Sequence, residues 1–81
     1  MRILHITDIH AGWNKDEEKE QIWWDDICKA ICAANRETPV DFVAATGDFC
    51  KMGSEWEFAR AEKYLNQLKE MLGFGAEKLF F

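Results

Sequence analysis

One stretch limits the possible folds of this chain more than any other: Asp41-Phe42-Val43-Ala44-Ala45-Thr46. Its residues are apolar on both faces of an extended chain, which is typical of a buried parallel strand rather than of an exposed hairpin. Residues 2–7 are also apolar and β-branched, and they predict an earlier strand. Parallel strands must be joined by a right-handed crossover, so the expected fold class is α/β.

The residues between these two strands predict a helix over about 17–36. Asn14 or Asp16 is the expected N-cap, and acidic residues follow where the helix dipole favours negative charge. The helix should end before Pro39, because a residue preceding proline avoids helical dihedrals. The expected core face consists of residues at helical spacing: Trp23, Ile27, Ala30, Ile31 and Ala34.

A second helix is expected after Ser54, which forms a capping-box pattern with Glu57. Gly73 is a typical helix stop, and residues 77–81 look like the start of a third strand. The expected core face of this helix is Phe58, Ala61, Leu65, Leu68 and Leu72. We therefore expect one domain, residues 1–81, built as β-α-β-α-β. A strand order of 1-2-3 would put both helices on one face of the sheet, and an order of 2-1-3 would put one helix on each face.

Composition narrows the possible partners and the compartment. A net charge of −5 gives no sign of a basic nucleic-acid surface, although it does not rule out a nuclease. No apolar run approaches the roughly 20 residues of a membrane helix, and the N-terminus does not resemble a signal peptide, so a cytoplasmic location is expected. Cys28, Cys32 and Cys50 are expected to be reduced, and the adjacent Trp23 and Trp24 are expected to pack in the core or against a partner.

Polar residues follow both strands directly. Asp8 and His10 come after the first strand, and in extended backbone their side chains would point the same way while Ile9 points oppositely and packs. Asp48 comes after the second strand, where Gly47 allows a sharp turn. Parallel strands deliver their carboxyl ends to one edge of the sheet, so these three side chains should meet and could bind a divalent metal.

Each residue alone has a simpler interpretation. An Asp-x-His pattern arises by chance, Asp48 could be an ordinary turn residue, and His10 could be a loop residue without a function. The metal interpretation is favoured by the position of both groups at successive strand ends.

Two stretches resemble the opening motifs of the calcineurin-like metallophosphoesterase superfamily: Arg2-Ile3-Leu4-His5-Ile6-Thr7-Asp8-Ile9-His10 and Asp41-Phe42-Val43-Ala44-Ala45-Thr46-Gly47-Asp48. The resemblance implies the N-terminal portion of that family's domain, a truncated αββα sandwich. It implies that Asp8 and His10 bind one metal and that Asp48 bridges two, which would be Mn, Fe or Zn. It also implies hydrolysis of phosphomonoesters or phosphodiesters by attack of a metal-bound hydroxide.

The family's later motifs, Gly-Asn-His, an isolated histidine and Gly-His-x-His, do not occur in this sequence, whose two histidines are His5 and His10. His5 is expected to pack on the sheet. No catalytic acid is identified, so we expect metal binding with little or no hydrolysis by these 81 residues. The alternative is a non-catalytic α/β module that associates with itself or with a partner through Trp13, Trp23, Trp24 and an uncovered sheet face. A receiver-like phospho-acceptor fits less well, because such a domain needs an acid pair after its first strand.

Overall fold

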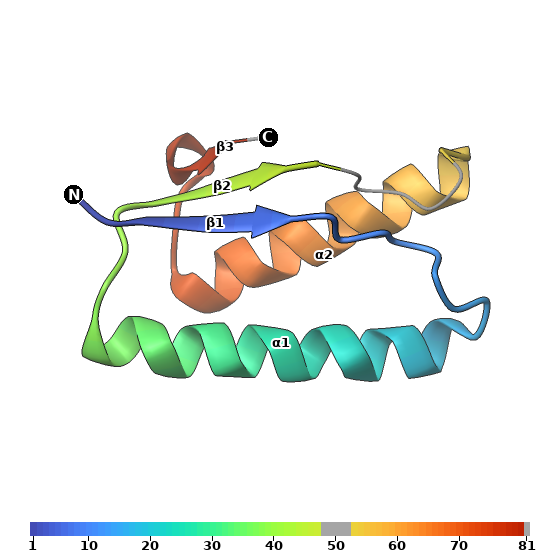
Figure 1. The fold of residues 1–81 in the computed structure, drawn as a ribbon, viewed down its shortest axis with the longest axis horizontal. Helices are drawn as coiled ribbons and strands as arrows, with labels where there is room; N and C mark the ends of the chain where they lie inside the picture. Colours follow the sequence, from blue (N-terminus) through green and yellow to red (C-terminus); the bar gives the residue numbers. More distant parts are fainter. Residues whose placement is uncertain (48–52, 81) are drawn as a thin grey trace.

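The computed structural model describes residues 1–47 and 53–80 and has the expected β-α-β-α-β order (Figure 1). Its elements are β1 (Ile3–Thr7), α1 (Glu17–Glu37), β2 (Phe42–Thr46), α2 (Glu55–Leu72), a 3-10 turn (Ala76–Lys78) and β3 (Leu79–Phe80). The strands form one parallel sheet in the order β1-β2-β3. The α/β prediction is confirmed, and the alternative strand order 2-1-3 is excluded.

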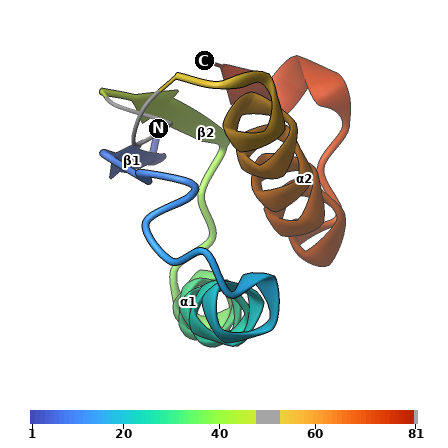
Figure 2. The same cartoon turned by 90° about the vertical axis from the view of Figure 1, so that its right-hand side faces the viewer.

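Both helices lie on the same side of the sheet (Figures 1 and 2). Val43 and Ala45 of β2 face the helices and are buried. On the opposite side, Ile3 and Phe80 are more than half exposed, and the Phe80 ring lies 5.6 Å from the ring of Phe42. We call this side, formed by the outward residues of the three strands, the open face.

Helix α1 begins as expected at an aspartate cap. Asp16 Oδ1 accepts hydrogen bonds from the backbone N–H groups of Glu18 and Lys19, at 3.1 and 3.3 Å. These bonds satisfy two of the backbone donors that a helix N-terminus leaves without an intrahelical partner. The helix runs to Glu37, one residue beyond the predicted end.

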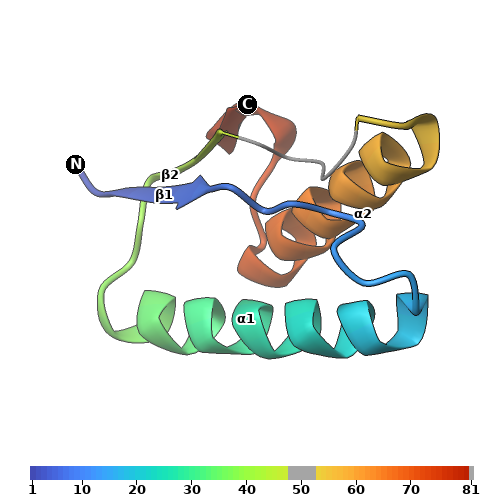
Figure 3. The ribbon, with the colours of Figure 1, turned by 45° about the vertical axis from the view of Figure 1, so that its right-hand side comes forward.

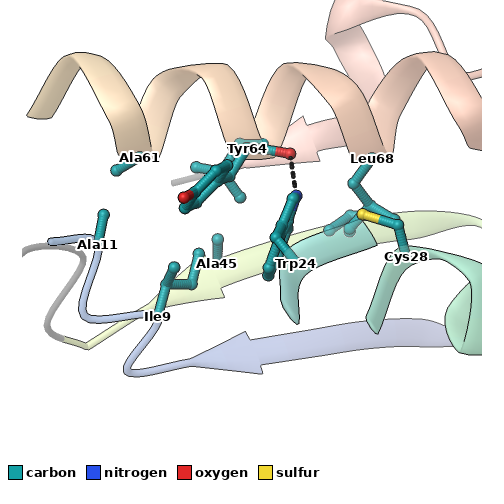
Figure 4. Packing of buried hydrophobic residues seen from close by; sticks show 10 residues of the cluster. Ile9, Ala11, Trp24, Cys28, Ala45, Ala61, Tyr64 and Leu68 are labelled. Atoms are coloured by element: carbon teal, nitrogen blue, oxygen red, sulfur yellow. Dashed lines mark hydrogen bonds between the residues drawn. The ribbon is translucent and has the colours of Figure 1, made fainter. Parts of the chain in front are cut away.

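The buried face of α1 is confirmed in part: Trp23, Ile27 and Ile31 are partly buried against the core, but the centre of the face is rotated from the predicted one. Glu20, Trp24 and Cys28 are its fully buried residues, whereas Ala30 and Ala34 are exposed. The reason is that α1 packs against α2 as well as toward the sheet. Trp24 Nε1 donates to the carbonyl oxygen of Tyr64 at 3.0 Å, and the two rings stack with centroids 5.3 Å apart (Figure 4).

Helix α2 has the predicted capping box, because the Glu57 carboxylate accepts hydrogen bonds from the backbone N–H and the hydroxyl of Ser54, at 3.0 and 2.7 Å. It ends at Gly73, whose φ of 74° is left-handed. Ala61, Leu65 and Leu68 are buried as predicted, and Leu72 is partly buried. Phe58 was wrongly expected in the core, since it is 55% exposed, and the buried Tyr64 was missed. Within the described residues, neither helix has the length and apolar character to cross a membrane.

Candidate metal centre

Asp8 lies where the chain leaves the sheet. Its backbone N–H donates to the carbonyl oxygen of Thr46 at 3.2 Å, one step beyond the last paired residues of β1 and β2, Thr7 and Thr46. The main chain of Asp8 is therefore still held by the neighbouring strand. This bond fixes the carboxyl end of β1 against the carboxyl end of β2.

The side chain of Asp8 also lies against β2. A Cβ atom at position 47 would stand 2.6 Å from Asp8 Oδ1, so a side chain there would force this carboxylate to shift. Gly47 has a φ of 79°, a left-handed conformation that glycine adopts at little cost. The end of β2 and the carboxylate of Asp8 are therefore in direct contact, as expected for adjacent parallel strands.

The side chains of Asp8 and His10 were expected to point the same way because of an extended backbone, and this reason is wrong. Both residues have left-handed backbone, with φ values of 55° and 52°, so they do not alternate as in an extended strand. Strand β1 ends at Thr7, because the chain then turns away from the sheet to reach α1. The packing prediction for Ile9 is confirmed, since Ile9 is buried in the core between the exposed Asp8 and His10.

Asp48, the third predicted ligand, lies outside the described residues. Within residues 1–47 and 53–80, no three His, Cys, Asp or Glu side chains are grouped closely enough to hold a metal ion. The donors of Asp8 and His10, a carboxylate and an imidazole, nevertheless suit a divalent transition metal. Both side chains are exposed, and the chain continues from Gly47, which touches Asp8, directly into Asp48. Two of the three expected ligands therefore lie within the described residues and carry donor atoms that suit a metal.

The other histidine, His5, lies on the open face. Its side chain is exposed, and its Nε2 is 2.7 Å from the hydroxyl oxygen of Thr46. His5 therefore lies on the sheet as predicted, but it is held by a polar contact and is not covered by packing.

A buried carboxylate beside this site was missed by the sequence reasoning. Glu20, in the first turn of α1, has no exposed surface. Its Oε1 accepts hydrogen bonds from the backbone N–H groups of Gly12 and Asn14, at 2.9 and 3.1 Å. Its Oε2 accepts from Arg60 Nη1 at 2.9 Å and from the Tyr64 hydroxyl at 2.6 Å. The sequence signal for the burial of Glu20 is its spacing, because Glu20, Trp24 and Cys28 form a single stripe of the helix at steps of four.

The hydrogen bonds of this network decide which groups carry charge. Burial alone would raise the pKa of the Glu20 carboxyl, but the bonds from Tyr64, from the Asn14 backbone and from Arg60 lower it below its ordinary value. Burial raises the pKa of the Tyr64 hydroxyl, and its bond to Glu20 raises it further. Glu20 is therefore a charged carboxylate. Arg60 forms an ion pair with it, and the neutral Tyr64 hydroxyl donates a hydrogen bond to it.

Comparison with known protein families supports the family resemblance of the two strand-end motifs. The family model described as "Calcineurin-like phosphoesterase" matches residues 1–79, a range that includes β1, β2 and the candidate ligands. No curated protein and no solved structure matches the chain. The chain belongs to the calcineurin-like phosphoesterase family.

Proposed function

We propose that Asp8, His10 and Asp48 bind divalent metal ions at the carboxyl edge of the sheet, as part of the active site of a phosphoesterase that hydrolyses phosphomonoesters or phosphodiesters. In the complete family site two metal ions are expected, with Asp48 contacting both. The expected metals are Mn, Fe or Zn.

The observation that carries this proposal is the contact between the two strand ends. The Asp8 carboxylate lies against Gly47, where an added Cβ would stand 2.6 Å from its Oδ1, and Asp48 is the next residue in the chain. The family match over residues 1–79 supports a phosphoesterase-type module built on these same strands. Asp8 and Gly47, the residue that precedes Asp48, lie at the carboxyl ends of adjacent strands, and open α/β sheets bind ligands at this edge.

The chemistry of the site follows from its donors. Bound divalent ions supply Lewis-acid polarisation of a phosphoryl oxygen and lower the pKa of water. The residues of this chain supply negative charge and one imidazole, and the backbone of Asp8 is held by its hydrogen bond to Thr46 of β2. The sequence has only two histidines, fewer than the family's motifs require, and no residue is identified as an acid for the leaving group. We therefore propose that these 81 residues bind metal but do not hydrolyse phosphoesters on their own.

Calorimetric titration with Mn²⁺ and Zn²⁺ tests the metal site. We expect the wild-type chain to bind both ions, and we expect His10→Ala and Asp48→Ala each to weaken binding by about tenfold or more. His5→Ala is the matched control, because it removes an exposed histidine that lies outside the Asp8-His10 motif and should leave the affinity unchanged. Absence of binding in the wild type, or unchanged binding in Asp48→Ala, would refute the metal assignment.

Hydrolysis is tested separately with para-nitrophenyl phosphate and bis-para-nitrophenyl phosphate. We expect no rate above that of the metal ions alone. A rate that exceeds this blank and disappears in Asp48→Ala would show that the 81 residues are catalytic and would overturn the proposed inactivity.

The open face favours a second candidate function, self-association of a non-catalytic module. Its exposed Ile3 and Phe80 would bury apolar area in a dimer, at about 25 cal/mol per Å². Trp24 cannot contribute to such an interface, because it is buried between the helices. Light scattering at micromolar concentration should then detect dimers that Ile3→Glu dissociates, while Ile22→Glu, on the exposed surface of α1, should have no effect. A wild-type monomer would refute it.

A further inference from the structure

The segment that carries His10 is attached to both helices. Figure 3 shows residues 8–16 leaving β1, passing beside α2 and then turning into α1. Ile9 and Ala11 of this segment are buried in the core, on either side of the exposed His10 (Figure 4). The direction of His10 therefore depends on what holds its two neighbours and Gly12 in place.

Glu20 holds this segment by its main chain. The two N–H groups that its Oε1 accepts belong to Gly12 and Asn14, which follow His10 by two and four residues. Backbone bonds of this kind fix the path of a loop without depending on the identity of its side chains. Because the carboxylate is charged and buried, each of these bonds is stronger than a neutral one.

The second oxygen of Glu20 connects the segment to α2. Arg60 donates from the same Nη1 to Glu20 Oε2 and to the carbonyl oxygen of Asn14, at 2.9 and 3.1 Å, and Tyr64 donates its hydroxyl to Oε2. Gly12 is also confined on its other side, since a Cβ there would stand 2.5 Å from Glu57 Oε2. Residues 12–14 are therefore fixed between a carboxylate of α1 and the side chains of α2.

We propose that Glu20 is a positioning residue for the metal site, which sets the place of His10 through the backbone of Gly12 and Asn14. This inference rests on the proposed function of Asp8, His10 and Asp48 as metal ligands. Glu20 does not contact the metal in this proposal. It acts in the way that outer groups orient the ligands of a metal, and loss of such a group commonly weakens metal binding 10–100-fold, an order-of-magnitude range.

The test is Glu20→Gln, which keeps the size of the side chain and removes its charge. We expect the affinity for Mn²⁺ and Zn²⁺ in calorimetry to fall by about tenfold. Hydrogen exchange, measured without metal, should show faster exchange of the Gly12 and Asn14 amides. Asp25→Asn is the matched control, because Asp25 is also on α1 but accepts hydrogen bonds from Gln21 and Gln67, which lie outside residues 8–14. Its metal affinity should equal that of the wild type.

The outcomes separate this inference from the proposed function. No metal binding by the wild type would refute both. Normal wild-type binding with unchanged affinity in Glu20→Gln, or an equal loss in Asp25→Asn, would refute the positioning role alone. If Glu20→Gln does not fold, Tyr64→Phe takes its place, because it removes one hydrogen bond to the carboxylate. We then expect the affinity to fall by about threefold, and an unchanged affinity in a folded Tyr64→Phe would refute the inference.

Discussion

Gly12 offers the sharpest test of how the segment between β1 and α1 is held. Its φ is 95°, and a Cβ added there would lie 2.5 Å from Oε2, 2.7 Å from Cγ and 3.0 Å from Cδ of Glu57. The Glu57 side chain is itself buried and caps α2 through Ser54, so it has little freedom to withdraw. Gly12→Ala therefore combines an unfavourable backbone conformation with a steric clash inside the core.

The two contributions have separate magnitudes. A left-handed conformation costs a residue with a Cβ about 1–2 kcal/mol. Overpacking a filled interior adds about 1–3 kcal/mol. Together they predict that Gly12→Ala lowers the free energy of unfolding by about 2–5 kcal/mol, a large part of the stability that folded domains commonly have.

Urea unfolding followed by tryptophan fluorescence measures this loss, because Trp24 is buried in the folded state. Gly53→Ala is the matched control, since Gly53 has a φ of 80° but, chain neighbours aside, no atom of residues 1–47 and 53–80 lies within 4 Å of the added Cβ. We expect this control to lose only the backbone contribution, about 1–2 kcal/mol. If Gly12→Ala lost no more stability than Gly53→Ala, the close packing of Gly12 against Glu57 would be refuted.

Two further predictions concern titratable groups. Because hydrogen bonding holds the pKa of Glu20 below its ordinary value of 4.5, the charged form stabilises the folded state above that pH and this contribution is lost as the pH falls further. Urea midpoints measured from about pH 6 to about pH 3 should therefore drop in the wild type and drop less in Glu20→Gln, and equal slopes would contradict the charged network. Burial raises the pKa of the Cys28 thiol to about 12, so in a Cys50→Ser background Ellman's reagent should label Cys32 while Cys28 reacts only on unfolding. Labelling of both thiols at the same rate in the folded protein would refute this.

The order and type of the elements were predictable because local patterns and tertiary packing agree on them. Asp16 and Ser54 begin helices, Gly73 ends one, and the apolar run of β2 becomes the central strand of a parallel sheet. The rotation of α1 was not predictable from its own periodicity. Helix α1 has two adjacent stripes with apolar residues, one containing Trp23 and the other Trp24. The Trp24 stripe is the more deeply buried because Trp24 packs against Tyr64 of α2, forty residues away in the chain.

The candidate site was predictable in its location but not in its local shape. Strand polarity alone brings Asp8 to the end of β2, where it contacts Gly47. The left-handed backbone of Asp8 and His10 has only a weak signal in the sequence, because Asp and His adopt this conformation more often than most residues but far less readily than glycine. The Glu20 network was missed for a related reason. A glutamate near a helix start is usually read as a favourable partner of the helix dipole, and only the structure reveals donors from two other segments converging on it.

The shared dependence of residues 12–14 on α1 and α2 has a consequence for the order of folding. The bonds from Glu20 to Arg60 and Tyr64 span 40 and 44 positions of the chain. Contacts so distant in sequence must overcome a large loss of chain entropy, and they form late unless they belong to the folding nucleus. The segment that carries His10 precedes α2 in the chain, yet its contact with Arg60 and its link through Glu20 to Tyr64 are completed only after α2 has docked.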